Sequence, residues 1–164
     1  MEIGMIHAIL KKTSNLLKFH EGSAMPYNIT FDPQSDVITL TFTGDISGKD
    51  LSEAASECIA LQKQTRVLRF LVEVNGWEVG ASFVEIYKLA YEQYAAEELQ
   101  RLSRIAVVLP TSLSGQAAAN FYETVCQNAG WNAQVFASRE EAIGWLTNSV
   151  DINSGATDYR IYPI

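Results

Sequence analysis

The side chains that most often carry catalysis are few in this 164-residue chain, and their spacing does not suit catalysis. Both histidines, His7 and His20, lie near the N-terminus, away from the segments that predict a core. The glutamate pairs at residues 97–98 and 140–141 are adjacent in sequence, so their carboxylates splay around a helix instead of facing each other. No Gly-x-Ser-x-Gly motif occurs, and a serine nucleophile would have no base predicted near it. We therefore expect a protein that is not an enzyme.

Cysteine chemistry and cofactor binding find no motif either. Cys58 and Cys126 stand alone in predicted helices, without Cys-x-x-Cys spacing, and are expected to be buried free thiols. Neither glycine-rich phosphate motif, Gly-x-x-x-x-Gly-Lys-Ser/Thr or Gly-x-Gly-x-x-Gly, is present. We expect no cofactor and no metal. Free thiols fit a reducing compartment, so the predicted location is cytoplasmic, with a peripheral position at a membrane as the alternative.

Aromatic side chains offer a different chemistry, the binding of nonpolar groups. Phe83, Tyr87, Tyr91 and Tyr94 form a stripe at helical spacing, and Trp77 lies in the loop before that helix. Core packing is the simplest interpretation of the stripe, and a pocket wall or dimer face is the alternative, because tyrosine suits half-hydrated surfaces. Trp77 either caps the core or lines an apolar cleft. These five residues are our candidates for ligand binding.

Polar side chains gather in three loops that follow predicted strands: Ser47, Asn75, Thr111, Ser112 and Ser114. The loops at the carboxyl ends of parallel strands meet along one rim of a sheet, where ligands collect. We therefore expect these residues to share a rim. Ser82, at the start of the aromatic helix, is expected to be a helix cap, with phosphorylation as the alternative.

These candidates need a parallel sheet to bring them together, and the strand patterns predict one. Residues 27–31 and 37–43 flank a turn that contains Pro33 and predict an antiparallel hairpin. Three further strands are expected at residues 67–74, 104–109 and 133–136, and the first of them is rich in branched side chains, which is typical of a central strand.

Helical patterns separate these strands. They run from the cap Ser47 to about residue 64, over about 81–98, from the loop 110–115 to about 128, and over 138–146, where Ser138 and Glu141 predict a capping box. Alternation of strands and helices indicates the α/β class. The predicted fold is a mostly parallel five-stranded sheet with an antiparallel edge strand and helices on its faces.

The chain divides into three parts. Residues 1–24 contain an amphipathic helix over 3–19 and a linker, residues 25–146 form the core domain, and residues 147–164 form a tail with a candidate edge strand over 158–162. The first part carries a net charge of +1, from three lysines and two glutamates, whereas the whole chain carries −7. Such an acidic body disfavours nucleic acid as a partner, and no apolar run is long enough to predict a transmembrane segment.

Four segments resemble the SpoIIAA-like family of bacterial domains, which is related to STAS domains. They are residues 37–44 leading into a helix, the run Arg69-Phe-Leu-Val-Glu-Val with the Gly76-Trp77 turn, the run Arg104-Ile-Ala-Val-Val, and the run Glu140-Glu-Ala-Ile-Gly-Trp-Leu. The resemblance implies a sheet with helices on its faces and an antiparallel first strand at an edge. It also implies either a regulatory protein-binding module, as in STAS relatives, or, through similarity to lipid-carrying Sec14-type domains, a binder of nonpolar molecules or membranes.

Some STAS relatives are switched by phosphorylation of a serine in an Asp-Ser-Ser/Thr-Gly motif. The matching stretch here is Val79-Gly80-Ala81-Ser82, which keeps only the hydroxyl of Ser82 and lacks the aspartate. Ser82 is therefore the phosphosite candidate that the resemblance implies.

Two hypotheses about function follow. The first is a noncatalytic binding module for a lipid or other nonpolar small molecule, or for a membrane surface, and it depends on the amphipathic helix, Trp77 and the aromatic stripe. The second is a protein-interaction or regulatory module of STAS type. It would act through homodimerisation or partner docking, by the N-terminal helix or the C-terminal strand.

Overall fold

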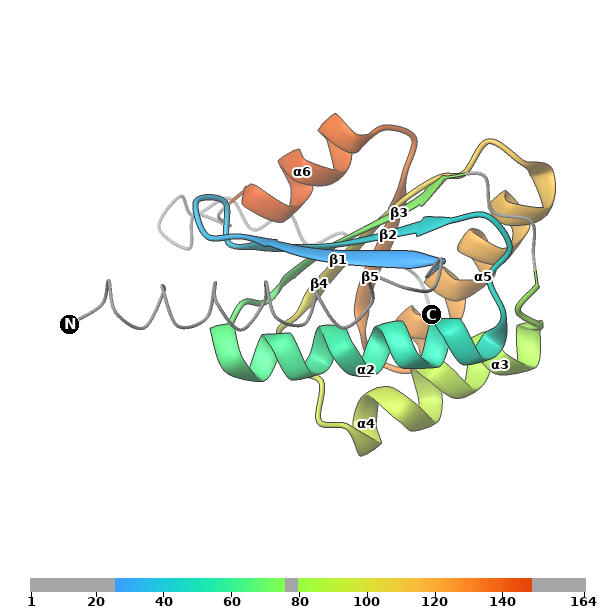
Figure 1. Cartoon of the computed structure of the whole chain (residues 1–164), viewed down its shortest axis with the longest axis horizontal. Helices are drawn as coiled ribbons and strands as arrows, with labels where there is room; N and C mark the ends of the chain where they lie inside the picture. The colour runs from blue at the N-terminus through green and yellow to red at the C-terminus, as the bar shows by residue number, and fades with distance from the viewer. Residues whose placement is uncertain (1–25, 76–79, 149–164) are drawn as a thin grey trace.

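The structure is a computed structural model that describes residues 26–75 and 80–148 (Figure 1). In these residues five strands form one sheet, in the order β1 (Tyr27–Asp32), β2 (Val37–Thr43), β3 (Arg69–Asn75), β4 (Arg104–Val108) and β5 (Asn132–Phe136). Strand β1 pairs antiparallel with β2, and the other neighbours pair in parallel. The predicted fold class is confirmed, with β3 as the central strand.

Helices cover both faces of the sheet unequally. One face carries α2 (Gly48–Thr65), α3 (Phe83–Lys88), the π-helix η1 (Leu89–Gln93), α4 (Tyr94–Ala96) and α5 (Leu113–Asn128), and the other carries α6 (Arg139–Thr147), as Figure 1 shows. We call the first group the helical layer. Successive strand residues point to opposite faces, so Ile38 and Phe70 face the helical layer while Val37 and Leu71 face α6.

Serine caps set where the helices begin. Ser47 and Ser82 each form a capping box, with Asp50 and Glu85 three residues later. Ser138 Oγ accepts a hydrogen bond from Glu141 N at 3.2 Å, which supplies one half of the box predicted there. Such caps satisfy backbone N–H groups that have no partner in the first turn.

The aromatic helix is not the single regular helix that its pattern predicts. The turn from Leu89 to Gln93 is a π-helix, which holds one residue more per turn than an α-helix. A regular helix rotates about 100° per residue, which would keep Tyr94 on the same side as Phe83. The extra residue turns every later side chain back by about that angle, so Tyr94 joins the face of Ile86, which is buried.

The helix predicted over residues 3–19, the loop residue Trp77 and the strand predicted over 158–162 lie outside the described residues.

Candidate functional site

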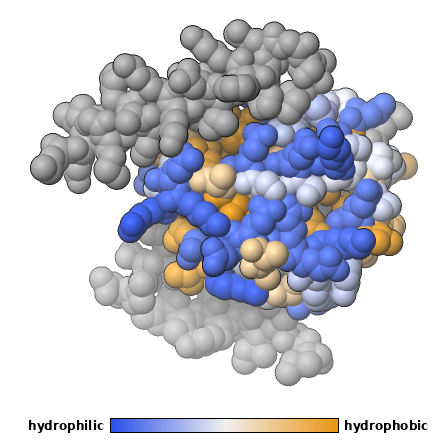
Figure 2. Space-filling view, turned by 60° about the horizontal axis from the view of Figure 1, so that its bottom comes forward, coloured by the Kyte–Doolittle hydropathy of each residue, from blue (hydrophilic) through white to orange (hydrophobic). Residues whose placement is uncertain are grey.

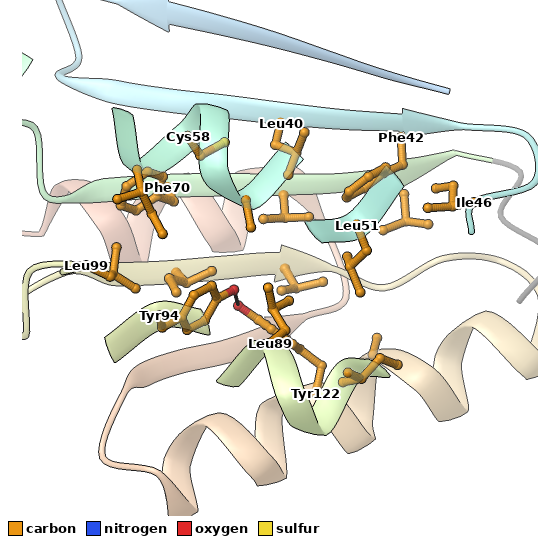
Figure 3. Close-up of a pocket in the computed structure, with 18 residues that line it drawn as sticks. Leu40, Phe42, Ile46, Leu51, Cys58, Phe70, Leu89, Tyr94, Leu99 and Tyr122 are labelled. Carbon is orange, nitrogen blue, oxygen red and sulfur yellow. Dashed lines mark hydrogen bonds between the residues drawn. The ribbon is translucent and has the colours of Figure 1, made fainter. Parts of the chain in front are cut away.

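The core between the sheet and the helical layer contains a cavity of about 80 Å³. Strands β2, β3 and β4 line one side of the cavity, and α2, α5 and the segment from α3 to α4 line the opposite side (Figure 3). The labelled lining residues in that view are Leu40, Phe42, Ile46, Leu51, Cys58, Phe70, Leu89, Tyr94, Leu99 and Tyr122. The lining is almost entirely hydrocarbon, so the cavity suits a nonpolar group.

Two tyrosines supply the hydroxyl groups of this wall. The Tyr94 and Tyr122 oxygens lie 2.7 Å apart and share a hydrogen bond, drawn as a dashed line in Figure 3. Burial raises the pKa of both phenols well above 10.0, because the low-dielectric surroundings penalise phenolate. Both groups are therefore neutral at physiological pH.

The lining also includes the thiol of Cys58. Burial raises the pKa of Cys58 from 9.0 to about 12, so its sulfur is protonated and unreactive at neutral pH. Both cysteines are buried and free, as the sequence predicts.

Trp131 packs on Tyr94, and hydrogen bonds of neighbouring residues hold the segment that carries it. Its ring meets Trp131 edge-on, with centroids 5.6 Å apart, and the indole Nε1 of Trp131 donates to the Ala90 carbonyl at 2.7 Å. Next to it, Gln93 Nε2 donates to the Ser52 carbonyl at 2.8 Å and to Ser56 Oγ at 3.0 Å, which ties the π-helix to α2. The π-turn thus sends Gln93 to α2 and Tyr94 to the cavity.

The size of the cavity limits what it holds. An engineered cavity that binds benzene measures about 150 Å³, so this one has about half that volume. A group of a few heavy atoms fits, whereas an acyl chain does not. Among the described residues the wall carries no Lys, Arg, His, Asp or Glu, so a charged group would find no partner among them and would be buried at high cost.

The structure separates the aromatic stripe into two parts. Phe83, Tyr87 and Tyr91 are 51%, 46% and 39% exposed, whereas Tyr94 is 7% exposed. The Tyr87 and Tyr91 rings stack on each other with their centroids 4.4 Å apart, and the Phe83 ring packs on that of Phe121 with their centroids 4.6 Å apart. Of the four stripe residues, Tyr94 alone lines the cavity, and ligand contact by the other three stays a prediction, as it does for Trp77.

The helical layer is largely hydrophilic on its outside. Figure 2 shows this side with hydrophobic surface confined to small areas between hydrophilic ridges.

The loops at the carboxyl ends of the strands come together at one rim. A Cβ added to Gly80 would lie 2.6 Å from the Ile46 carbonyl oxygen, so these two loops touch directly. Asn75 and Thr111 border the same depression, together with Glu73 and Arg139. An ion pair joins the Glu73 carboxylate to the Arg139 guanidinium across it.

The rim serines serve mainly as caps. The hydroxyls of Ser47 and Ser112 accept hydrogen bonds from Asp50 N at 3.2 Å and Gly115 N at 3.1 Å. Ser114 is exposed in the first turn of α5. A ligand role for these rim residues stays a prediction.

Ser82 caps α3 with the same geometry. Its hydroxyl accepts from Glu85 N at 3.3 Å and donates to Glu85 Oε2 at 3.0 Å. A phosphate on this oxygen would face the Glu85 carboxylate and lose the cap, which argues for the structural role. Phosphorylation of Ser82 stays a prediction.

Tyr122 is the site residue that sequence reasoning did not single out. It follows the apolar spacing of its helix, as Phe121 and Val125 do, and that pattern predicts core packing. Nothing in the spacing indicates that its hydroxyl meets that of Tyr94, because the two lie on different helices, 28 residues apart.

Residues 26–75 and 80–148 contain neither a metal-binding cluster nor a membrane-spanning helix. No group of three or more His, Cys, Asp or Glu side chains there is placed to hold a metal ion. No helix in the same ranges combines the length and the apolar character needed to cross a membrane.

Comparison with known proteins yields one finding. The model of the SpoIIAA-like family matches residues 37–147, from β2 through α6. No curated protein and no solved structure matches the chain.

Proposed function

The chain belongs to the SpoIIAA-like family, and from this premise we propose that it is a noncatalytic binding module whose ligand is a nonpolar small molecule. Membership supports a regulatory or binding module. The observation that carries the finer proposal is the apolar cavity between the sheet and the helical layer. The docking alternatives predicted from the sequence depend on segments outside the described residues.

The cavity also sets the scale of affinity. Burying about 150 Å² of ligand surface at about 25 cal/mol per Å² gives roughly 4 kcal/mol. Loss of translational and rotational freedom offsets part of this gain. A probe of a few carbon atoms is therefore expected to bind with a Kd in the millimolar range.

Titration with cyclopropane, a three-carbon hydrocarbon small enough for the cavity, tests the proposal. We expect saturable shifts of the methyl resonances of Leu40, Ile46 and Leu89 in NMR spectra of the full chain, because these side chains line the cavity. Native mass spectrometry of the purified protein, followed by solvent extraction, would then identify a natural ligand.

A matched pair of variants controls for nonspecific binding. Ala119 lines the cavity, so Ala119→Val fills part of it and is expected to weaken binding at least fivefold. Ala117 lies on the same helix but is exposed, so Ala117→Val should bind as the natural chain does. Equal binding by both variants, or no saturable shift in the natural chain, would contradict the proposal.

A further inference from the structure

We propose that residues 158–162 of this chain, which lie outside the described residues, pair antiparallel with β1 along its outer edge and extend the sheet by one strand. The inference concerns a surface of the domain and is independent of what the cavity binds. It names the occupant of an edge that would otherwise be open to strands of other molecules.

The outer edge of β1 presents backbone groups that can pair with a further strand. Thr43 N donates to the Pro26 carbonyl at 2.8 Å, and in an antiparallel pair the residues that bond to the neighbouring strand alternate along the chain. The N–H and C=O groups of every second residue of β1 therefore point away from the sheet, and these residues are Tyr27, Ile29 and Phe31. Within residues 26–75 and 80–148 these groups have no hydrogen-bond partner.

The opposite edge of the sheet is covered by side chains of α5. Glu123 Oε1 accepts from Val135 N at 2.8 Å, and Gln127 Nε2 donates to the Ala133 carbonyl at 3.1 Å. Strand β1 has no such cover within the described residues, and its ladder with β2 is regular, without a proline, a lysine or a bulge in β1. Edges that lack these protective features readily pair with another strand. The sheet can therefore be extended at β1.

The C-terminal tail starts at the end of the sheet from which it must enter this edge. Arg104 Nη1 donates to the Asn148 carbonyl at 3.0 Å, so the end of α6 lies at the start of β4. The turn after β1 lies at the same end, because Arg69 Nη1 donates to the Ser35 carbonyl at 3.2 Å and Arg69 pairs with Arg104 (Figure 1). A strand that enters from this end runs antiparallel to β1.

The tail is also long enough to reach the edge. Four strand spacings of about 4.8 Å separate β4 from a strand outside β1, a distance of about 19 Å. Residues 149–157 connect the end of α6 to the proposed strand, and nine residues span up to about 30 Å when extended. The chain can therefore cover its own edge without a second copy.

The apolar side chains of residues 158–162 fit this position. Tyr27, Ile29 and Phe31 face the helical layer, where Ile29 and Phe31 are only partly buried. A register that places Tyr159 opposite Phe31 and Ile161 opposite Ile29 continues this apolar face by two side chains. It also pairs the outward backbone groups of Ile29 and Phe31 with the tail.

The polar side chains fit the other face of β1. In the same register Arg160 lies opposite Thr30, and both Thr30 and Asp32 are exposed. Asp158 then stands opposite Asp32, and Arg160 lies diagonal to Asp32, close enough to offset the repulsion between the two carboxylates. Polar residues of the tail therefore meet polar residues of the strand.

A disulfide trap tests the inference in the full chain. Thr30 and Arg160 form a non-hydrogen-bonded pair in the proposed register, with Cα atoms about 4.5 Å apart, a distance that a disulfide can span. We expect Thr30→Cys/Arg160→Cys to form an internal disulfide on mild oxidation, with the chain still monomeric in nonreducing electrophoresis. Cys58 and Cys126 are buried and do not compete.

The control moves one cysteine to the other edge of the sheet. Gln134 is exposed on β5, as Thr30 is on β1, and β5 is closer to the start of the tail. Because Glu123 and Gln127 occupy that edge, Gln134→Cys/Arg160→Cys should form its disulfide at least about tenfold more slowly. Equal rates in the two double variants would overturn the proposal. A disulfide that joins only two molecules of Thr30→Cys/Arg160→Cys would also overturn it, by placing the tail of a second copy on the edge.

Hydrogen exchange gives a second readout that needs no new cysteine. The amides of Ile29 and Phe31 should exchange at least about tenfold more slowly than those of an unstructured peptide, because they donate to the tail. Ile161→Pro removes an N–H that faces β1 and should abolish most of this protection, whereas Arg160→Pro removes an N–H that faces solvent and should change it by less than about threefold. Unprotected amides in the natural chain, or equal protection in Ile161→Pro, would overturn the proposal.

Discussion

Within residues 26–75 and 80–148, one face of the sheet is covered by a single helix, α6, which packs on β3, β4 and β5, whereas on the other face the helical layer leaves a cavity beside Tyr94 and Tyr122. The α6 face buries Leu71, Ala106, Ala142 and Leu146 completely. Small side chains at Ala106 and Ala142 allow the helix to approach the strands closely. The buried centre of this face is therefore formed by closely approaching side chains, and its depression lies at the rim, beside Glu73 and Arg139.

The helical layer meets a harder packing problem. Several helices and a π-turn converge over the same strands, and their side chains come from segments that are distant in sequence. Protein interiors normally pack with few voids, so a void of about 80 Å³ marks the face where close packing has been relaxed. The comparison teaches that the two faces pack their cores differently, and that the void lies on the side of the helical layer.

Truncation of a large side chain on each face gives the largest expected effect. Leu146→Ala should lower the free energy of unfolding by about 4 kcal/mol, because it opens a new cavity in a filled core. Leu89→Ala borders the existing void, where fewer contacts remain to be lost, and should cost about 2–3 kcal/mol. Urea denaturation followed by circular dichroism measures both, and an equal or larger loss for Leu89→Ala would break the comparison.

Enlargement of an alanine should change stability in opposite directions on the two faces. Ala142→Val overfills the α6 core and should cost about 1–3 kcal/mol. Ala119→Val places its methyl groups in the cavity, and this gain offsets the lower helix propensity of valine, so we expect a change of less than about 1 kcal/mol, in the stabilising direction. Thermal denaturation of the two variants decides this, and destabilisation by Ala119→Val as large as by Ala142→Val would count against a relaxed face.

Alkaline sensitivity is expected to belong to the helical layer. Burial raises the pKa of both Cys58 and Cys126 from 9.0 to about 12. Below pH 9 each thiol is protonated whether the chain is folded or unfolded, so stability does not depend on it. Between pH 9 and 12 the unfolded chain loses the proton first, so stability falls by up to about 1.4 kcal/mol per pH unit for each thiol. Urea denaturation at pH 8 and pH 10 measures the fall, and a slope unchanged in the Cys58→Ala variant would contradict it.

The ion pair on the α6 face should give the smallest effect. Arg139→Met leaves the Glu73 carboxylate, which is 17% exposed, without its partner and should cost about 1 kcal/mol. Lys49→Met is the control, because its pair with Glu53 at 3.5 Å is exposed and should contribute less than about 0.5 kcal/mol. Urea denaturation at low and high salt measures the stability lost in each variant. Equal losses would contradict the expectation that partial burial of Glu73 makes its ion pair more important for stability than the exposed pair.

The sequence predicted the fold because local patterns dominate it. Strand alternation in 37–43, the apolar run 105–109 and the caps Ser47 and Ser138 each depend on neighbours in the chain, and the parallel arrangement follows from the alternation of strands and helices. The meeting of the three loops at one rim follows in turn from strand direction.

The inner site was predicted only in part, and the reason is physical. Spacing identified Tyr94 as an aromatic member of a helical stripe, but the π-turn that contains Tyr91 and directly precedes Tyr94 breaks the period on which that reasoning depends. Tyr122 carried no signal beyond the apolar pattern of its helix.

By itself, therefore, the sequence determined the elements, their order, their direction and the family to which the chain belongs. Tertiary structure alone decided that Tyr94 turns inward, that its hydroxyl meets Tyr122, and that the helical layer stops short of filling its core. Periodicity reports which face of a single element is apolar, whereas a cavity and a hydrogen bond between two helices depend on how several elements fit together in space.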